Sequence, residues 1–163
     1  MKFIGKYKHL IVSIMMVIAL AMLFLPCGYY LTYNIISYRA NGFQIIFGLK
    51  DVEYVIYGFN IFGLIMILLV AFCAILPFTK LKDHNLFYLI EAILSLVSTI
   101  LMITLPKSTN HAREGVRDLF HGDAGIYFGT MILALAFVFC LYNFLMRNEI
   151  NKENKKEEAI DVK

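Results

Sequence analysis

Four long apolar stretches dominate the chain, and each is closed by polar or charged residues. They run from Leu10 to Pro26, from Tyr54 to Phe78, from Leu86 to Leu105 and from Ala124 to Met146. A helix needs about 20 mostly apolar residues to cross a hydrocarbon core of ~30 Å, and all four stretches fall in the usual range. Lipid offers no partner to bare backbone N–H and C=O groups, so such segments are helices. The sequence predicts an all-α membrane protein, an antiparallel four-helix transmembrane bundle.

The composition leaves room for one domain. The chain has 163 residues, of which 60% are hydrophobic. We expect residues 1–147 to form the transmembrane domain. Residues 148–163 mix Lys, Glu and Asn and have too little apolar content to pack, so a disordered charged tail is predicted. The net charge of +3 is small and scattered, which gives no reason to expect binding to nucleic acid.

Basic residues predict the orientation through the positive-inside rule. If the N-terminus is cytoplasmic, the cytoplasmic segments hold ten Lys and Arg residues and the outer loops hold five. The short connection Thr79–Asn85 alone contributes Lys80 and Lys82. The abundance of Lys, Ile, Asn, Phe and Tyr is typical of an AT-rich bacterial genome. We therefore expect a multi-pass protein of a bacterial plasma membrane with both termini in the cytoplasm.

Glu91 is the only charged residue within any of the four stretches. An acidic group at membrane depth is costly, which makes it a functional candidate. Ser95, Ser98 and Thr99 follow at helical spacing and give the third stretch one polar stripe. The stripe could relay a proton or a cation. It could equally pack against neighbouring helices through side-chain hydrogen bonds, with Glu91 paired at the inner surface.

Small residues mark two of the predicted helices as packing elements, because they let helix backbones approach closely in lipid. Gly125 and Gly129 form a GxxxG pair in the fourth stretch. Gly58 and Gly63 lie in the outer half of the second. The GxxxG pair fits packing within one chain, and it also fits a homodimer seam.

The second outer loop, residues 107–123, carries His111, Glu114, Asp118 and His121. On a helix these spacings place the four side chains on one face, because each residue turns by ~100°. Imidazole and carboxylate groups on one face could hold Zn²⁺. The HExxH pattern of metalloproteases is absent. A solvated face of an amphipathic helix explains the same pattern, and no cofactor is predicted.

The first outer loop, residues 28–53, is apolar for a loop. Residues 29–35 alternate in a period of two, which predicts a short strand. Asn41-Gly42 is a turn signal, and the apolar run Phe43–Phe47 after it fits a second strand or a short helix. A loop of this kind either folds down onto the outer end of the bundle or offers a contact surface to another membrane protein.

The three cysteines, Cys27, Cys73 and Cys140, do not share a loop. No outer disulfide framework is therefore predicted. A buried cysteine usually behaves as a small hydrophobic side chain, which is what we expect of the two inside the membrane.

The predicted topology, with inside termini and a larger first outer loop, resembles that of claudins and tetraspanins. The chain lacks the Trp and the Cys pair of the claudin loop and the CCG of tetraspanins. The segment from Asn41 to Gly48, a turn followed by an aromatic and an apolar run ending in Phe-Gly, is similar to small uncharacterised four-span proteins of low-GC Gram-positive bacteria. This resemblance implies no known activity.

We expect a non-enzymatic plasma-membrane protein, an accessory or interaction subunit that works through its outer loops. Its expected partners are the lipid bilayer and another membrane protein or a second copy of the chain. The alternative is a small transporter or ion-conducting subunit that uses Glu91. A third interpretation is an outward-facing metal-binding protein that uses the second outer loop.

Overall fold

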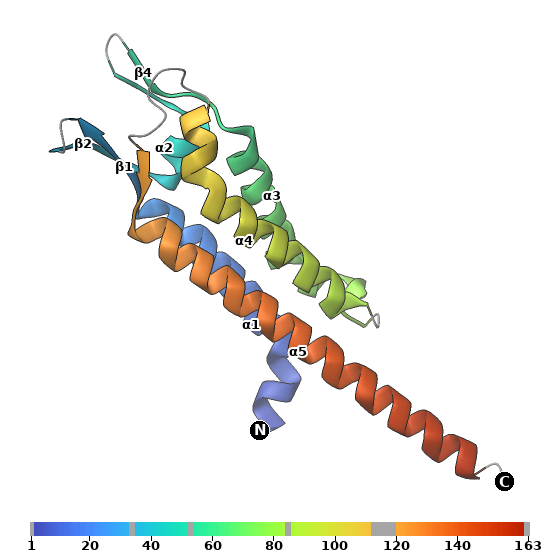
Figure 1. Cartoon of the computed structure of the whole chain (residues 1–163). Coiled ribbons are helices and arrows are strands. Elements are labelled where there is room, and N and C mark those ends of the chain that lie inside the picture. Colours follow the sequence, from blue (N-terminus) through green and yellow to red (C-terminus); the bar gives the residue numbers. More distant parts are fainter. Residues whose placement is uncertain (1, 33–34, 52–53, 84–85, 112–119, 162–163) are drawn as a thin grey trace.

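The structure, a computed structural model, describes residues 2–32, 35–51, 54–83, 86–111 and 120–161. Long helices run side by side, and the strands gather at one end of them (Figure 1). We call this the sheet end. The opposite end, beyond which the last helix continues alone, is called the tail end.

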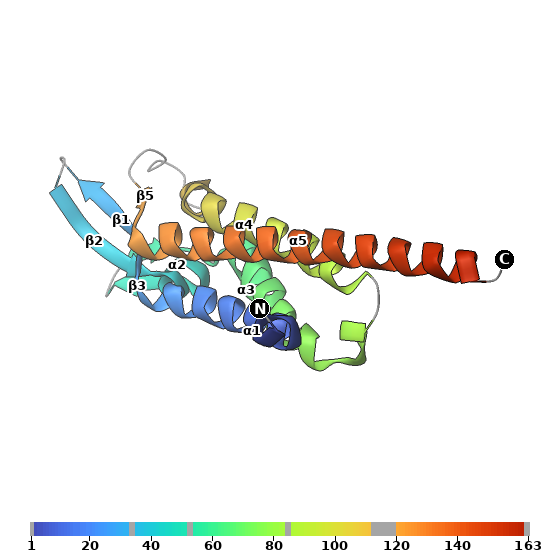
Figure 2. The same cartoon turned by 90° about the horizontal axis from the view of Figure 1, so that it is seen from below.

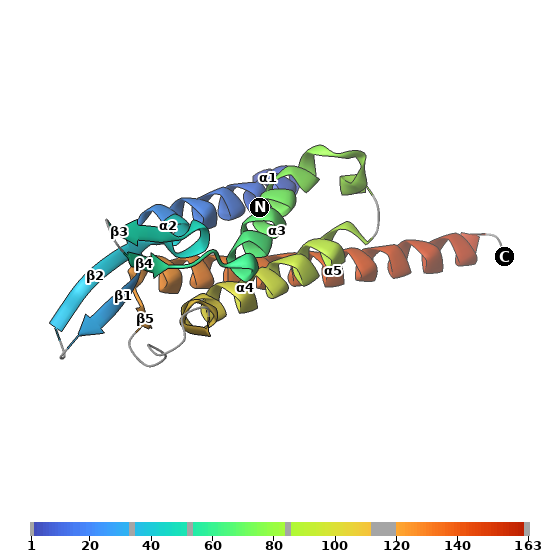
Figure 3. The same cartoon turned by 90° about the horizontal axis from the view of Figure 1, so that it is seen from above.

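Four helices form the body of the molecule: α1 (Lys2–Ala21), α3 (Ile61–Ile75), α4 (Phe87–His111) and α5 (Ala124–Asp161). α4 packs along α5 and α3, and α1 packs against α3 and α5. Each helix therefore has two of the others as neighbours, as the turned views also show (Figures 2 and 3). Short connections close this arrangement: the 3-10 turn η1 (Met22–Phe24) after α1, and η2 (Leu76–Phe78) and η3 (Lys80–Asp83) after α3.

Three of the helical segments are long and apolar enough to cross a membrane. They are Ile61–Phe78, Phe87–Ser108 and Ala124–Arg147, and about a third of each is buried inside the molecule. The apolar part of the first helix, Lys8–Phe24, is shorter. Large apolar side chains cover the outward faces of these helices, as at Leu68, Ile100 and Leu135. Among the described residues, the chain thus has three long apolar helices and a shorter fourth.

The helix α3, which corresponds to the second apolar stretch, begins later than the sequence predicted. Its first residue is Ile61, and the segment from Tyr54 to Tyr57 is instead strand β4. Asn60 causes the late start, because its side-chain oxygen accepts hydrogen bonds from the backbone N–H groups of Phe62 and Gly63. An asparagine in this position is a preferred helix cap. The aromatic run before it belongs to a hairpin with β3 (Leu49–Asp51).

A three-stranded sheet brings together two parts of the chain that lie far apart in the sequence. Its order is β2 (Ile35–Asn41), β1 (Pro26–Thr32) and β5 (Phe120–Gly122), with antiparallel pairing throughout. β5 pairs only with the first part of β1, where Gly28 lies opposite Gly122. β1 and β2 continue past it and leave the sheet with a free outer edge along β2 within the described part of the chain.

The short helix α2 (Gly42–Phe47) covers the sheet end of the bundle. Ile45 and Ile46 are fully buried there, and the backbone N–H of Asn60 donates to the carbonyl of Ile46 at 2.8 Å. Asn41 starts this helix with a capping box that it shares with Gln44, so the predicted turn at Asn41-Gly42 is wrong. Of the alternatives for this loop, the structure has the short helix, and the helix folds down onto the bundle.

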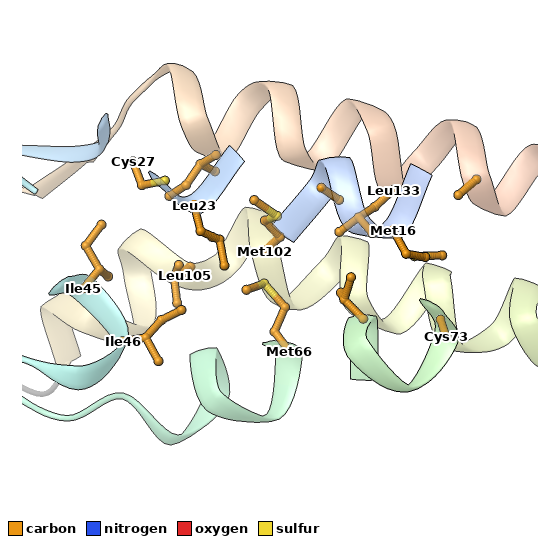
Figure 4. Close-up of a cluster of buried hydrophobic side chains, with 14 of the residues drawn as sticks. Met16, Leu23, Cys27, Ile45, Ile46, Met66, Cys73, Met102, Leu105 and Leu133 are labelled. Atoms are coloured by element: carbon orange, nitrogen blue, oxygen red, sulfur yellow. The ribbon is translucent and has the colours of Figure 1, made fainter. Parts of the chain in front are cut away.

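The core lies between the four helices and under α2 (Figure 4). Three methionines from three different helices, Met16, Met66 and Met102, meet near Leu133 in its middle. Unbranched methionine side chains fill irregular space between helices well. The core is continuous from Val12 near the tail end to Cys27 at the sheet end.

The segment that was predicted to be a disordered tail continues α5 as far as Asp161. Its Lys, Glu and Ala residues have high helix propensity. A helix that is already formed by packing extends at little cost, because only its nucleation is unfavourable. The low apolar content of this segment argues against its packing in a core, but it does not argue against a helix.

Candidate functional site

Glu91 is the most unusual side chain of the core. It lies one turn after the start of α4 and is 0% exposed. The thiol of Cys140 on α5 donates a long hydrogen bond to its Oε2, with a distance of 3.7 Å between Sγ and oxygen. Its other oxygen, Oε1, is buried and has no hydrogen-bond partner within the described part of the chain. The carboxyl group therefore faces the interior of the bundle.

No ion pair of Glu91 is seen in the part of the chain that the structure describes. The interpretation that pairs this residue with a lysine at the surface does not fit this geometry. Cys73 on α3 is also fully buried and lies within electrostatic range of the carboxyl group. Three helices thus enclose one carboxyl group together with two thiols. The rotation of each helix about its own axis decides that the carboxyl group of Glu91 faces the other two helices. The periodicity of the sequence does not give that rotation.

The polar stripe on α4 also faces inwards. Ser95 and Ser98 are fully buried, and Thr99 is partly buried. Each hydroxyl donates to a backbone carbonyl of the same helix: Ser95 to Ala92 at 3.0 Å, Ser98 to Leu94 at 2.9 Å, and Thr99 to Ser95 at 2.7 Å. The hydroxyl protons are used within the helix, as is common for Ser and Thr in helices. The four side chains share one face but form no continuous hydrogen-bonded relay among the described residues.

Apolar clusters close the Glu91 site at both ends. Towards the tail end, Phe87 and Tyr88 pack with Leu76 and Phe144, and the two neighbouring rings meet edge to face with centroids 5.0 Å apart. Towards the sheet end, the methionine cluster fills the core.

Three of the four glycines singled out in the sequence lie at close contacts within the chain. A Cβ at Gly125 would meet the Cys27 sulfur at 2.5 Å and the carbonyl of Met22 at 2.8 Å. A Cβ at Gly129 would collide with the end of Met102. The GxxxG face is therefore used for packing against the end of α1 and against α4, so it is not free to form a homodimer seam.

The two glycines of the second apolar stretch differ. Gly63 is pressed against Ile46 of α2 and Leu105 of α4. Gly58 precedes α3, and a Cβ there would meet no atom within 4 Å. Gly58 is thus not a packing position, and its prediction as one was wrong because the helix starts three residues later.

The structure describes only part of the predicted metal site. Glu114 and Asp118 lie outside the described residues, as does the side chain of His111. His121 is in strand β5 and stacks on Tyr29 with ring centroids 5.4 Å apart, so the predicted helix does not extend to it. No group of three metal-ligating side chains occurs among residues whose side chains are described.

Two polar contacts at the sheet end were not predicted from the sequence. Asn60 donates from Nδ2 to the Ser108 hydroxyl at 2.8 Å, which ties the start of α3 to the end of α4. Arg39 of β2 pairs with Asp123 before α5 at 3.6 Å. The signal for Asn60 was available, because an asparagine two residues after a glycine and before an apolar run is a helix-start pattern. Arg39 and Asp123 are separated by about half of the chain, so their pair left no local signal.

Cys27 lies at the junction of the sheet and the bundle and is fully buried. Its thiol donates to the carbonyl of Met22 at 3.6 Å. Burial raises the pKa of the Cys27 thiol to about 12, and the nearby Asp123 adds to the rise. The group is therefore a neutral thiol at physiological pH and is not suited to nucleophilic chemistry.

The carboxyl group of Glu91 and the three thiols are buried and closed off from solvent. The arrangement offers one buried acid in the bundle and a sheet held at its end. No protein family matches the chain, and neither a curated protein nor a solved structure is significantly similar to it.

Proposed function

We propose that this chain is a multi-pass plasma-membrane protein of non-enzymatic type that works as an interaction subunit through its sheet end. All four helices cross the membrane, both termini are cytoplasmic and the sheet faces outwards. The depth of α1, the edge of the sheet and the placement of α2 support this proposal.

The depth of α1 supports a fourth crossing. Its apolar part, Lys8–Phe24, spans about 25 Å at 1.5 Å per residue, which is close to the hydrocarbon thickness. It packs against α3 and α5, both of which are long enough to cross. The Ser13 hydroxyl donates to the carbonyl of Ala74 near the tail end of α3 at 2.8 Å. A helix held alongside two crossing helices in this way lies at the same depth.

The free edge of β2 is the observation that carries the proposed interaction. β2 has seven residues and pairs on one side only, with β1, within the described chain. An unpaired strand edge accepts an extended segment of another chain through main-chain hydrogen bonds. α2 is folded down on the bundle, and no further strand pairs with β2 in the part of the chain that the structure describes. The partner we propose is an extended outer segment of a second membrane protein.

Site-specific photo-crosslinking in native membranes tests this proposal. A photoreactive amino acid is placed at each position from 35 to 39 in turn, with Ile93 and Ile100 on the outward face of α4 as control positions. We expect protein adducts from β2 positions and lipid adducts only from the controls. Adducts of the chain with itself identify a second copy as the partner in place of another protein. The absence of protein adducts from all five β2 positions overturns the proposal.

A second candidate function rests on Glu91 alone. A buried carboxyl group without a cationic partner inside a membrane bundle is costly and marks a site for a proton or a cation. Reconstituted protein is tested for proton or cation flux, with Glu91→Gln as the variant and Glu149→Gln in the C-terminal segment as the control. Flux that the Glu91 variant abolishes supports a transporter, and equal flux in both variants excludes this role.

A further inference from the structure

A small cavity lies at the sheet end between α4, β5 and α5. It has a volume of about 220 Å³. Its lining comprises Ile103, Pro106, Lys107, His121, Gly122, Ile126 and Tyr127. We propose that this cavity binds the headgroup of an anionic phospholipid from the leaflet at the sheet end, with an acyl chain lying against the exposed apolar side chains of α4 and α5. The inference rests on the proposed membrane insertion and adds a specific ligand to it.

The cavity has apolar residues nearer the centre of the bundle and polar residues nearer the sheet, as the acyl chains and the headgroup of a lipid require. Ile103 lies one turn closer to the bundle centre than Lys107, and its side chain is 55% exposed on the outward face of α4. Tyr127 on α5 is 63% exposed. The lining therefore includes side chains that are exposed on the outer surface of the two helices. Lys107 and His121, both exposed, stand on the side of the cavity towards the sheet.

The charge of the rim selects an anion. Lys107 brings a positive charge to the point where α4 leaves the apolar zone. A lysine at this depth places its ammonium group at the headgroup level while its stem stays against apolar surface. The Tyr127 hydroxyl adds a hydrogen-bond donor at the same level, as tyrosines do at membrane interfaces. A phosphate with one negative charge fits this set of side chains in a cavity of about 220 Å³.

The local backbone keeps the cavity open at Gly122. A Cβ at this position would lie 3.5 Å from the Tyr127 oxygen and 3.6 Å from Cγ of Pro106, which are ordinary contact distances. Both of these residues line the cavity. We expect a larger side chain at position 122 to enter the space that these two residues line. This gives a variant that fills the cavity and leaves the rim charge unchanged.

The test uses the full-length protein in detergent micelles that contain equal amounts of phosphatidylglycerol and phosphatidylcholine. Native mass spectrometry counts the lipids retained by the wild type and by Lys107→Gln, Lys107→Arg, Gly122→Leu and Lys80→Gln. Lys80 is an exposed lysine at the tail end and serves as the matched control. A second arm adds inorganic phosphate in excess to the wild type. Thermal unfolding of each variant in the same micelles checks that it is folded.

We expect the wild type to retain phosphatidylglycerol in preference to phosphatidylcholine. Lys107→Gln should reduce this preference about fivefold, the usual effect of one lysine near a charged membrane surface. Lys107→Arg and Lys80→Gln should keep it, and Gly122→Leu should lose retention of both lipids while remaining folded. Unchanged retention in Lys107→Gln and Gly122→Leu overturns the proposal. Displacement by inorganic phosphate also overturns it, because that result identifies a site for a free anion. A protein that inserts normally but shows no lipid preference fails only this inference and leaves the proposed function intact.

Discussion

The sulfur of Cys140 lies 3.7 Å from Oε2 of Glu91, so α5 and α4 meet through a polar contact inside the bundle. Neither residue is exposed, and no cation neutralises the carboxyl group within the described residues. A single weak donor compensates only a small part of the cost of burying a carboxylate. The bundle therefore keeps this acid at the expense of stability, which is expected of a functional group.

Replacement of Glu91 tests this cost. We expect Glu91→Gln to change the free energy of unfolding by less than about 1 kcal/mol, or to increase it, because the amide keeps the size of the side chain and cannot ionise. Glu91→Ala should lower it by about 2–4 kcal/mol, since it leaves a cavity between three helices. Unfolding in mixed micelles measures both. A Gln variant as unstable as the Ala variant would show that the carboxyl group itself stabilises the fold.

The glycines predict a graded series. Gly125→Ala should destabilise the protein by about 1–3 kcal/mol, because the new methyl group meets backbone oxygens that cannot move aside. Gly129→Ala should cost less, since it meets only the flexible end of Met102. Gly58→Ala should have no measurable packing cost. Thermal unfolding of the three variants checks the order, and a Gly58 variant as unstable as the Gly125 variant would contradict it.

Asn60 combines two roles that substitutions can separate. Asn60→Ala removes the cap of α3 and the bond to Ser108, and we expect a loss of about 1–3 kcal/mol. Asn60→Asp keeps the capping oxygen but loses the donor from Nδ2 to the serine. It should therefore have an intermediate stability. Ser108→Ala in both backgrounds completes a double-mutant cycle. Equal stability of the Asp and Ala variants would mean that the cap contributes nothing.

The reactivity of Cys27 predicts a pH dependence. Its pKa is raised from 9.0 to about 12, so at pH 8 it holds about a thousandfold less thiolate than an ordinary thiol. In a chain with Cys73→Ala and Cys140→Ala, maleimide labelling of Cys27 should be very slow at pH 8 and should rise as the pH approaches the raised pKa. Ala124→Cys, at an exposed position, provides the reference rate. Labelling of both at the same rate at pH 8 would contradict the burial of Cys27.

The hydropathy of the sequence predicted the long apolar helices. Long apolar runs must satisfy their backbone groups internally, so their helical state followed from composition alone. The start of α3 was missed because the aromatic segment Tyr54–Tyr57 continues the apolar run without a break, and the cap at Asn60 was read as part of the helix. Asn41-Gly42 failed for a related reason, since asparagine favours both turns and helix starts.

The candidate site could be predicted only in part. The position of Glu91 in an apolar run identified it, but its contact with Cys140 depends on how three helices rotate against each other. No local pattern encodes that rotation. The sheet is a similar case, because β5 joins β1 from almost a hundred residues away through a three-residue pairing that is too short to give a signal.

The central claim is that four helices cross the membrane and hold the sheet on its outer side. Single cysteines at Lys80, Lys107 and Ala124, in a chain without native cysteines, are exposed to a membrane-impermeant maleimide in intact cells that also carry an N-terminal reporter of cytoplasmic location. We predict labelling at positions 107 and 124, protection at position 80 until the cells are opened, and a cytoplasmic N-terminus. An N-terminus on the same side as positions 107 and 124 would contradict the account, because α1 would then not cross.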